Sequence, residues 1–121
     1  MNYVQLCPMC ATPCVSRFED KCWGCGSSSD PIFVWSSLAN VVKMLIKRGI
    51  AVKDTDIKLC TTHKTKVTIY LTGIVPEYLF GELPCGWQLL QLSDEVWYLR
   101  CNEEHPDKRI RELEDWLKDK N

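Results

Sequence analysis

The sequence predicts an α+β protein, and three observations lead to this class. A cysteine-rich segment with few other apolar residues occupies positions 1–29. From residue 30 onward, apolar residues recur at helical spacing, then at alternate positions, then at helical spacing again. A Gly-Ser stretch over 26–29 separates the two patterns. We therefore predict a small head (1–29) and an α-β-β-β-β-α body (30–121) with an antiparallel sheet and both helices on one face.

The body is expected to begin with a helix. Asp30 is a suitable cap, and Pro31 suits the first turn because its missing N–H costs no hydrogen bond there. Gly49 can supply the left-handed residue that ends a helix. The sequence thus predicts one helix through Arg48, with an apolar face made of Val34, Leu38, Val41, Val42, Leu45 and Ile46.

Two hairpins and a second helix are expected after Gly49. Apolar residues alternate on both sides of a polar turn over 57–71, and again over 87–101. Residues 76–81 are expected to form one helical turn between the hairpins. Pro106 can open the last helix. Its apolar stripe is Ile110, Leu113, Trp116 and Leu117.

The eight cysteines indicate metal binding. Residues 1–17 lack the basic start and apolar stretch of a signal peptide, so a disulfide framework is not expected. Two Cys-x-x-Cys pairs can each hold one side of a tetrahedral ion. Zinc is preferred over iron because the head is too small to shield a redox centre. We predict a structural zinc site formed by Cys7, Cys10, Cys22 and Cys25.

Several alternatives stay open in the head. Cys14 can replace Cys10 or Cys22 as fourth ligand, although we expect it to be a spare thiol. The cysteines can also be small buried apolar residues without metal, and four thiolates are compatible with iron. A redox role fits less well, because thioredoxin-like Cys-x-x-Cys motifs lie between the strand and helix of a βαβ unit.

A second group of metal-ligating residue types lies in the body. Cys60 and His63 have a spacing that can bind metal from a tight turn, and Cys85 or Cys101 can complete the site. The interpretation that we favour is that Cys60 and Cys101 are buried thiols at strand ends and that His63 and His105 are exposed turn residues. Cys60 and His63 can also be read as nucleophile and base, but two residues of one turn rarely face each other productively. We therefore do not expect an enzyme.

Charge and hydropathy limit the partners. The formal net charge is −1 and the sequence pI is about 6.1, so the whole chain has no electrostatic attraction to nucleic acid or anionic membranes. No apolar run approaches the roughly 20 residues that span a bilayer, and we expect a cytoplasmic protein. A local basic stretch gives candidate nucleic-acid contacts at Lys43, Lys47, Arg48, Lys58, Lys64 and Lys66. Aromatic residues do not interleave these charges in the sequence, so a solvated polar face is favoured.

Five tryptophans are many for 121 residues, and most should lie in the core. If one face of the sheet stays uncovered and displays Trp97 or Tyr98, that face is a candidate partner surface, because interface centres are enriched in aromatic residues.

Two resemblances add to this picture. The head, with CPMC and CWGCG over 7–26, resembles the zinc ribbons of many unrelated proteins, which implies a fold and no particular role. The body is similar to small uncharacterised proteins of phages and prophages of Gram-positive bacteria, in the segments 45–50, 60–63, 83–87 and 98–100. This resemblance implies an accessory viral protein in the host cytoplasm that binds and blocks a host protein.

The leading hypothesis is a zinc-stabilised, non-enzymatic interaction protein that binds a macromolecular partner, in particular a host protein. One alternative is a nucleic-acid-binding zinc-ribbon protein that uses the basic stretch. Another is a thiol- or metal-dependent enzyme built on Cys60 and His63.

Overall fold

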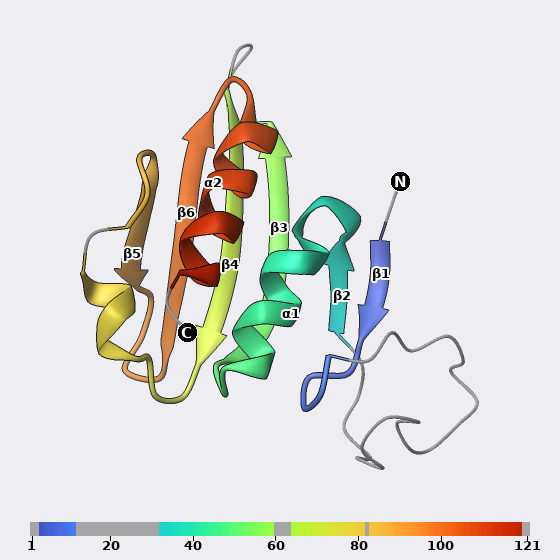
Figure 1. Cartoon of the computed structure of the whole chain (residues 1–121), viewed down its shortest axis with the longest axis vertical. Coiled ribbons are helices and arrows are strands. Elements are labelled where there is room, and N and C mark those ends of the chain that lie inside the picture. Colours follow the sequence, from blue (N-terminus) through green and yellow to red (C-terminus); the bar gives the residue numbers. More distant parts are fainter. Residues whose placement is uncertain (1–2, 12–31, 60–63, 82, 120–121) are drawn as a thin grey trace.

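The computed structural model describes residues 3–11, 32–59, 64–81 and 83–119. These residues form an α+β structure, as predicted, with two α-helices and two antiparallel sheets, of which the two-stranded sheet β1-β2 was not predicted (Figure 1). No helix in these ranges is long and apolar enough to cross a membrane. The elements in chain order are β1 (Tyr3–Leu6), β2 (Ile32–Trp35), the 3-10 turn η1 (Ser36–Leu38), α1 (Ala39–Lys47), β3 (Ala51–Leu59), β4 (Thr65–Thr72), the 3-10 turn η2 (Glu77–Phe80), β5 (Trp87–Gln91), β6 (Val96–Glu103) and α2 (Pro106–Lys118).

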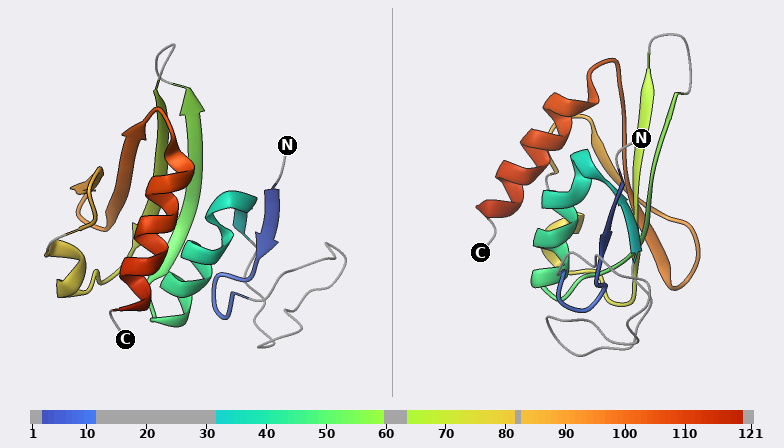
Figure 2. Two further views of the ribbon diagram at one scale, coloured as in Figure 1. Left: turned by 45° about the horizontal axis from the view of Figure 1, so that its top comes forward. Right: turned by 90° about the vertical axis from the view of Figure 1, so that its right-hand side faces the viewer.

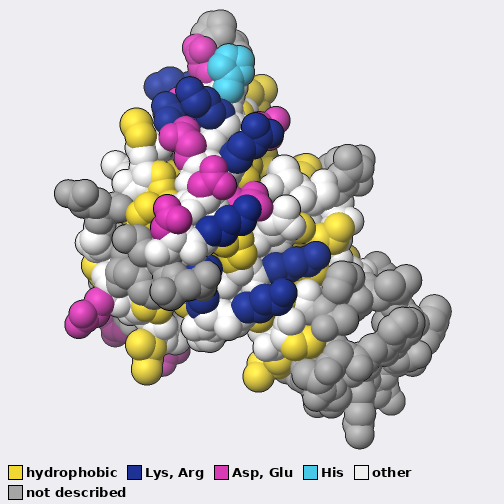
Figure 3. Space-filling view, viewed as in Figure 1, with side chains coloured by type: hydrophobic (Ala, Val, Ile, Leu, Met, Phe, Trp, Pro, Cys, Tyr) yellow, Lys and Arg dark blue, Asp and Glu magenta, His cyan; other side chains and the backbone are white. Residues whose placement is uncertain are grey.

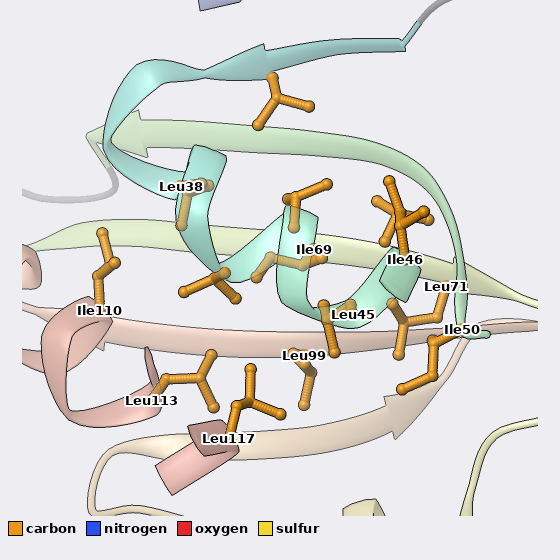
Figure 4. Packing of buried hydrophobic residues seen from close by; sticks show 14 of the residues in the cluster. Leu38, Leu45, Ile46, Ile50, Ile69, Leu71, Leu99, Ile110, Leu113 and Leu117 are labelled. Atoms are coloured by element: carbon orange, nitrogen blue, oxygen red, sulfur yellow. The ribbon is translucent and has the colours of Figure 1, made fainter. Parts of the chain in front are cut away.

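The larger sheet has the strand order β3-β4-β6-β5 and is antiparallel throughout. Both α-helices pack on the same face of this sheet (Figure 2). Strands β3 and β4 form the first predicted hairpin, and β5 and β6 form the second. Apolar side chains of the helices and of the two central strands fill the space between the layers, as Figure 4 shows for Leu45, Ile69, Leu99, Leu113 and Leu117.

The predicted start of the first helix is wrong. Ile32–Trp35 is the strand β2, and α1 begins only at Ala39, after one 3-10 turn. The sequence Ile-Phe-Val-Trp consists of β-branched and aromatic residues, which favour strands. It also finds a partner, because β2 pairs with β1 in a ladder that joins Val4 to Val34. The predicted stop is confirmed, since Gly49 has φ +84° and its N–H donates to the Ile46 carbonyl at 2.9 Å.

The predicted head and body share a sheet and a core. Strand β1 belongs to the predicted head and pairs with β2 of the predicted body. Leu6 and Ala11 are buried in the same cluster as Val34 and Leu38. The Gly-Ser stretch over 26–29 lies outside the described residues. Within the described residues, the two predicted parts are joined by direct packing and by backbone hydrogen bonds.

Candidate functional site

The first Cys-x-x-Cys pair lies in a turn directly after β1. Cys7 is buried with 1% of its surface exposed, and Cys10 is half-buried. The backbone N–H of Met9 donates to Cys7 Sγ at 3.4 Å, and the N–H of Ala11 donates to the Cys7 carbonyl at 2.9 Å. A hydrogen bond from an amide to sulfur favours the thiolate, which is the form that binds metal. The turn thus supplies one amide donor to a sulfur of the first cysteine pair, that of Cys7.

Ala11 has a backbone conformation that the sequence analysis did not anticipate. Its φ is +65°, and it is the only non-glycine residue of the described chain in the left-handed region. Residues other than glycine seldom adopt this conformation. Ala11 follows Cys10 as Gly26 follows Cys25, so the two cysteine pairs have matching positions in the sequence. Gly26 was therefore the sequence signal that could have predicted a left-handed residue at the matching position, Ala11.

The structure places only half of the predicted zinc ligands. Cys14, Cys22 and Cys25 lie outside the described residues. Among the described residues, no group of three or more His, Cys, Asp or Glu side chains could hold a metal ion. The four-cysteine site therefore stays a prediction, and the geometry that bears on it is the Cys7–Cys10 turn.

Only two of the four residues of the second candidate metal site lie within the described residues. Cys60 and His63 lie outside the described residues, while Cys85 is exposed and Cys101 is buried on β6. Burial raises the pKa of the Cys101 thiol to about 11, and the nearby charges of Glu103 and Cys85 act in the same direction against that of Arg109. Cys85 thus lies within electrostatic reach of Cys101, which their sequence spacing did not reveal.

A polar cluster surrounds this thiol pair and connects three elements. Arg109 of α2 forms salt bridges with Glu103 of β6 at 3.3 Å and with Glu112 at 2.9 Å. The indole N–H of Trp87 donates to the Arg109 carbonyl at 2.8 Å, which ties β5 to the same helix. Gly86, with φ +90°, lies so close that an added Cβ would be 3.2 Å from Glu103 Oε1. We interpret this cluster as a structural connection between sheet and helix.

The two thiols should differ in reactivity. At pH 8, iodoacetamide is expected to modify Cys85 at least about a hundredfold faster than Cys101, because alkylation requires an accessible thiolate and the pKa of Cys101 is about 11. Peptide mapping by mass spectrometry measures both rates, and unfolding in denaturant should remove the difference. Equal rates in the folded protein would show that Cys101 is not buried as described.

The candidate nucleic-acid residues lie on two faces of the molecule. Lys43 and Lys47 belong to α1, which covers one face of the sheet, and Arg48 directly follows it; Figure 3 shows Lys and Arg side chains over the two helices. Lys58 and Lys66 are cross-strand partners on β3 and β4 and point to the other face, since their neighbours Ile57 and Val67 pack into the core. This set therefore does not form one continuous surface.

The cations at the end of α1 have a structural role. The guanidinium of Arg48 donates a hydrogen bond to the Leu117 carbonyl near the end of α2. Lys47, Arg48 and Lys118 border a shallow depression of about 310 Å³ between the two helices. Positive charge at helix C-termini offsets the partial negative charge of the terminal carbonyls. These residues therefore stabilise two helix ends.

The sheet face opposite the helices displays a row of aromatic residues. Val67, Ile69 and Leu71 of β4 are buried under the helices, so the alternate residues of β4 point to the opposite face, which we call the open sheet face. Tyr70 and Tyr98 are cross-strand partners there, with ring centroids 5.8 Å apart and planes tilted by 44°. Asp54, Tyr70, Tyr98 and Leu90 form one row across the four strands.

A second row beside the tyrosines is polar and well packed. It consists of Asp56, Thr68, Arg100 and Gln88. The Arg100 guanidinium donates to Gln88 Oε1 at 2.9 Å, and Lys58 forms an ion pair with Asp56 at 3.6 Å. Thr68 is only 3% exposed although it lies on the open sheet face, so its neighbours cover it. Within this row, Arg100 and Thr68 therefore have a defined neighbour or cover.

Of the two aromatic residues named from the sequence, only Tyr98 lies on the open sheet face. Trp97 points to the side of the helices, as its alternation with buried Leu99 requires, and its ring meets Phe80 edge to face at 5.0 Å. The aromatic neighbour of Tyr98 on this face is Tyr70, which was not predicted from the sequence. Only the strand register could identify this pair.

Comparisons with known proteins assign no family. The resemblances of the head to zinc ribbons and of the body to phage proteins stay hypotheses that rest on the quoted residues. Function must therefore be argued from the cysteine turn and the open sheet face. No protein-family model, no curated protein and no solved structure matches this chain.

Proposed function

We propose that this protein is a zinc-stabilised, non-enzymatic interaction protein that binds a protein partner through the open sheet face. The observation that carries the proposal is the row of Tyr70, Tyr98 and Leu90 across three strands, on the face that the helices leave uncovered. Tyrosine is enriched at the energetic centres of protein interfaces because it offers a large rigid surface with a polar end. The hydrogen bond between Arg100 and Gln88 in the neighbouring row lowers the entropy cost of ordering these two side chains on binding.

Charge on this face favours a protein partner over nucleic acid. Lys58, Lys66 and Arg100 share the face with Asp54 and Asp56, so the charges are mixed. A nucleic-acid surface needs a continuous positive path along the phosphates. Two carboxylates beside the tyrosines oppose such a path, whereas protein interfaces commonly pair charges of both signs.

The resemblance of the body to phage proteins suggests that the partner is a host protein. In this proposal the protein is phage-encoded, works in the host cytoplasm and inhibits a host protein by covering its surface. The zinc ion would be held by Cys7, Cys10, Cys22 and Cys25. Its role would be to fix the N-terminal part against β2, away from the binding surface.

A capture experiment tests the proposal. The immobilised full chain is compared with a Tyr70→Ala/Tyr98→Ala variant, in extract of the bacterium from which the gene comes. Specific capture of a host protein, quantified by mass spectrometry, is expected to fall at least about tenfold, because truncation of two central aromatic residues removes most of an interface's energy. Circular dichroism and thermal melting verify that the variant is folded.

A matched control separates the two faces. Lys43→Glu/Lys47→Glu reverses charge on α1 and should leave capture within about twofold of wild type. Capture that survives loss of both tyrosines but not this charge reversal would contradict the proposal. Tight binding of wild type to generic DNA or RNA, weakening log-linearly with salt, would favour the nucleic-acid alternative instead.

A further inference from the structure

We infer that the open sheet face carries an anchoring site for an arginine side chain of the protein partner, formed by Asp54, Tyr70 and Tyr98. The inference rests on the proposed function and names the chemistry that this surface recognises. The three residues occupy successive strands in one cross-strand row. A carboxylate therefore stands on one side of Tyr70 and a second aromatic ring on the other.

The spacing suits a guanidinium group. Directly opposed residues of antiparallel strands have Cβ atoms about 4.5–5.5 Å apart, and the two tyrosine ring centroids are 5.8 Å apart. A planar cation above an aromatic ring is attracted when it lies within about 6 Å of the ring centroid. A guanidinium over Tyr70 would lie within reach of the Asp54 carboxylate and beside the Tyr98 ring. Arginine fits better than lysine, because its planar group can stack on a ring and bind a carboxylate at once.

A β-bulge places Asp54 in this row. The register of β3 against β4 shifts between Val52 and Asp54, so that Val52 and Thr55, three residues apart, both face the core. Without the extra residue, strict alternation would put only one of them there. The bulge brings Asp54 opposite Tyr70. Its Oδ1 accepts a hydrogen bond from the Thr55 N–H at 2.8 Å, which orients the carboxylate.

The charged residue directly opposite Tyr70 is acidic. Arg100, the cation of the adjacent row, donates to Gln88 on the side of β5. The acidic residues Asp54 and Asp56 both lie on β3, and Asp56 is offset by Lys58 at 3.6 Å. Lys58 and Lys66 form a further row beyond Asp56 and Thr68, so the charge directly opposite Tyr70 is that of Asp54. A phosphate group there would meet a carboxylate, whereas an arginine would find a ring and an opposite charge together.

Titration of the full chain with short peptides tests the inference. The probes are Ac-Gly-Arg-Gly-Arg-Gly-NH2 and matched peptides with citrulline or lysine, followed by amide chemical shifts. The arginine peptide is expected to shift the resonances of Asp54, Tyr70 and Tyr98. It should bind about tenfold more tightly than the citrulline peptide, which lacks the charge, and more tightly than the lysine peptide.

The variant Asp54→Asn should lower the affinity for the arginine peptide about three- to fivefold, since an exposed ion pair contributes modestly. The affinity for the citrulline peptide should not change. Asp56→Asn, in the adjacent row, is the control and should have less effect.

Equal binding of the arginine and citrulline peptides, or an unchanged affinity in Asp54→Asn, overturns the arginine site. The proposed function then still stands if Tyr70→Ala/Tyr98→Ala abolishes capture of the host protein. A thymidine oligonucleotide that displaces the arginine peptide at lower concentration also overturns the inference.

Discussion

Removing the proposed zinc ion from the N-terminal cysteines is expected to destabilise the whole protein. The Cys7–Cys10 turn leads directly out of β1, and Leu6 and Ala11 on either side of it are fully or nearly fully buried in the common core. Structural zinc commonly contributes on the order of 10 kcal/mol to the folding of small cysteine-rich units. Because β1 and β2 share a ladder, loss of the metal should release both strands. We expect Cys7→Ser to lower the free energy of unfolding by at least about 3 kcal/mol.

Metal analysis and thermal melting measure this effect. Freshly purified protein should contain about one zinc per chain, and Cys7→Ser or Cys22→Ser should lower the melting temperature by more than about 10 °C. Chelator should have the same effect on wild type and little further effect on either variant. Cys85→Ser, which changes an exposed cysteine far from the first pair in sequence, is the control.

Absence of metal would contradict the site. An unchanged melt in zinc-free protein would instead show that residues 1–29 and 30–121 fold independently, as the sequence pattern suggested.

Much of the body could be predicted because its sequence periodicity is strong. Alternating apolar residues identified both hairpins, and Pro106 marked the first residue of α2. The segment Ile32–Trp35 was assigned to the wrong element for a physical reason. Val34 and Leu38 lie four residues apart, which fits a helix, but Val34 gains more by pairing with Val4. That partner is 30 residues away, and local spacing carries no information about it.

The candidate site was less predictable than the fold. Paired cysteines predicted a metal-binding turn, a role that stays a prediction, and their spacing alone did not give the left-handed conformation of Ala11. Alternation shows that a strand has two faces, but only the position of the helices decides which face stays uncovered. The bulge after Val52 then sets the partner of Tyr70. Aromatic and charged residues that are separate in the sequence therefore become neighbours only once the strand register is known.

In the shared core, Leu99→Ala is expected to lower the free energy of unfolding strongly. Leu99 is fully buried on β6, the strand between β4 and β5, and it lies opposite Ile69 and Leu89. Figure 4 shows it near Leu117 of α2. Shortening a buried leucine removes its transfer free energy and leaves a cavity, which together cost about 2–5 kcal/mol. Urea unfolding should therefore show a clearly lower midpoint with an unchanged slope.

The exposed residue Leu92 provides the matched control for this substitution. It follows β5 and has 62% of its surface in solvent, so Leu92→Ala should change the free energy of unfolding by less than about 0.5 kcal/mol. Leu99 and Tyr98 are adjacent on β6 and point to opposite faces, so the two sites also test the assignment of those faces. Tyr98→Ala should cost less stability than Leu99→Ala and yet have the larger effect on partner capture per folded molecule. The reverse order for stability would mean that the tyrosine face, and not the leucine face, packs into the core.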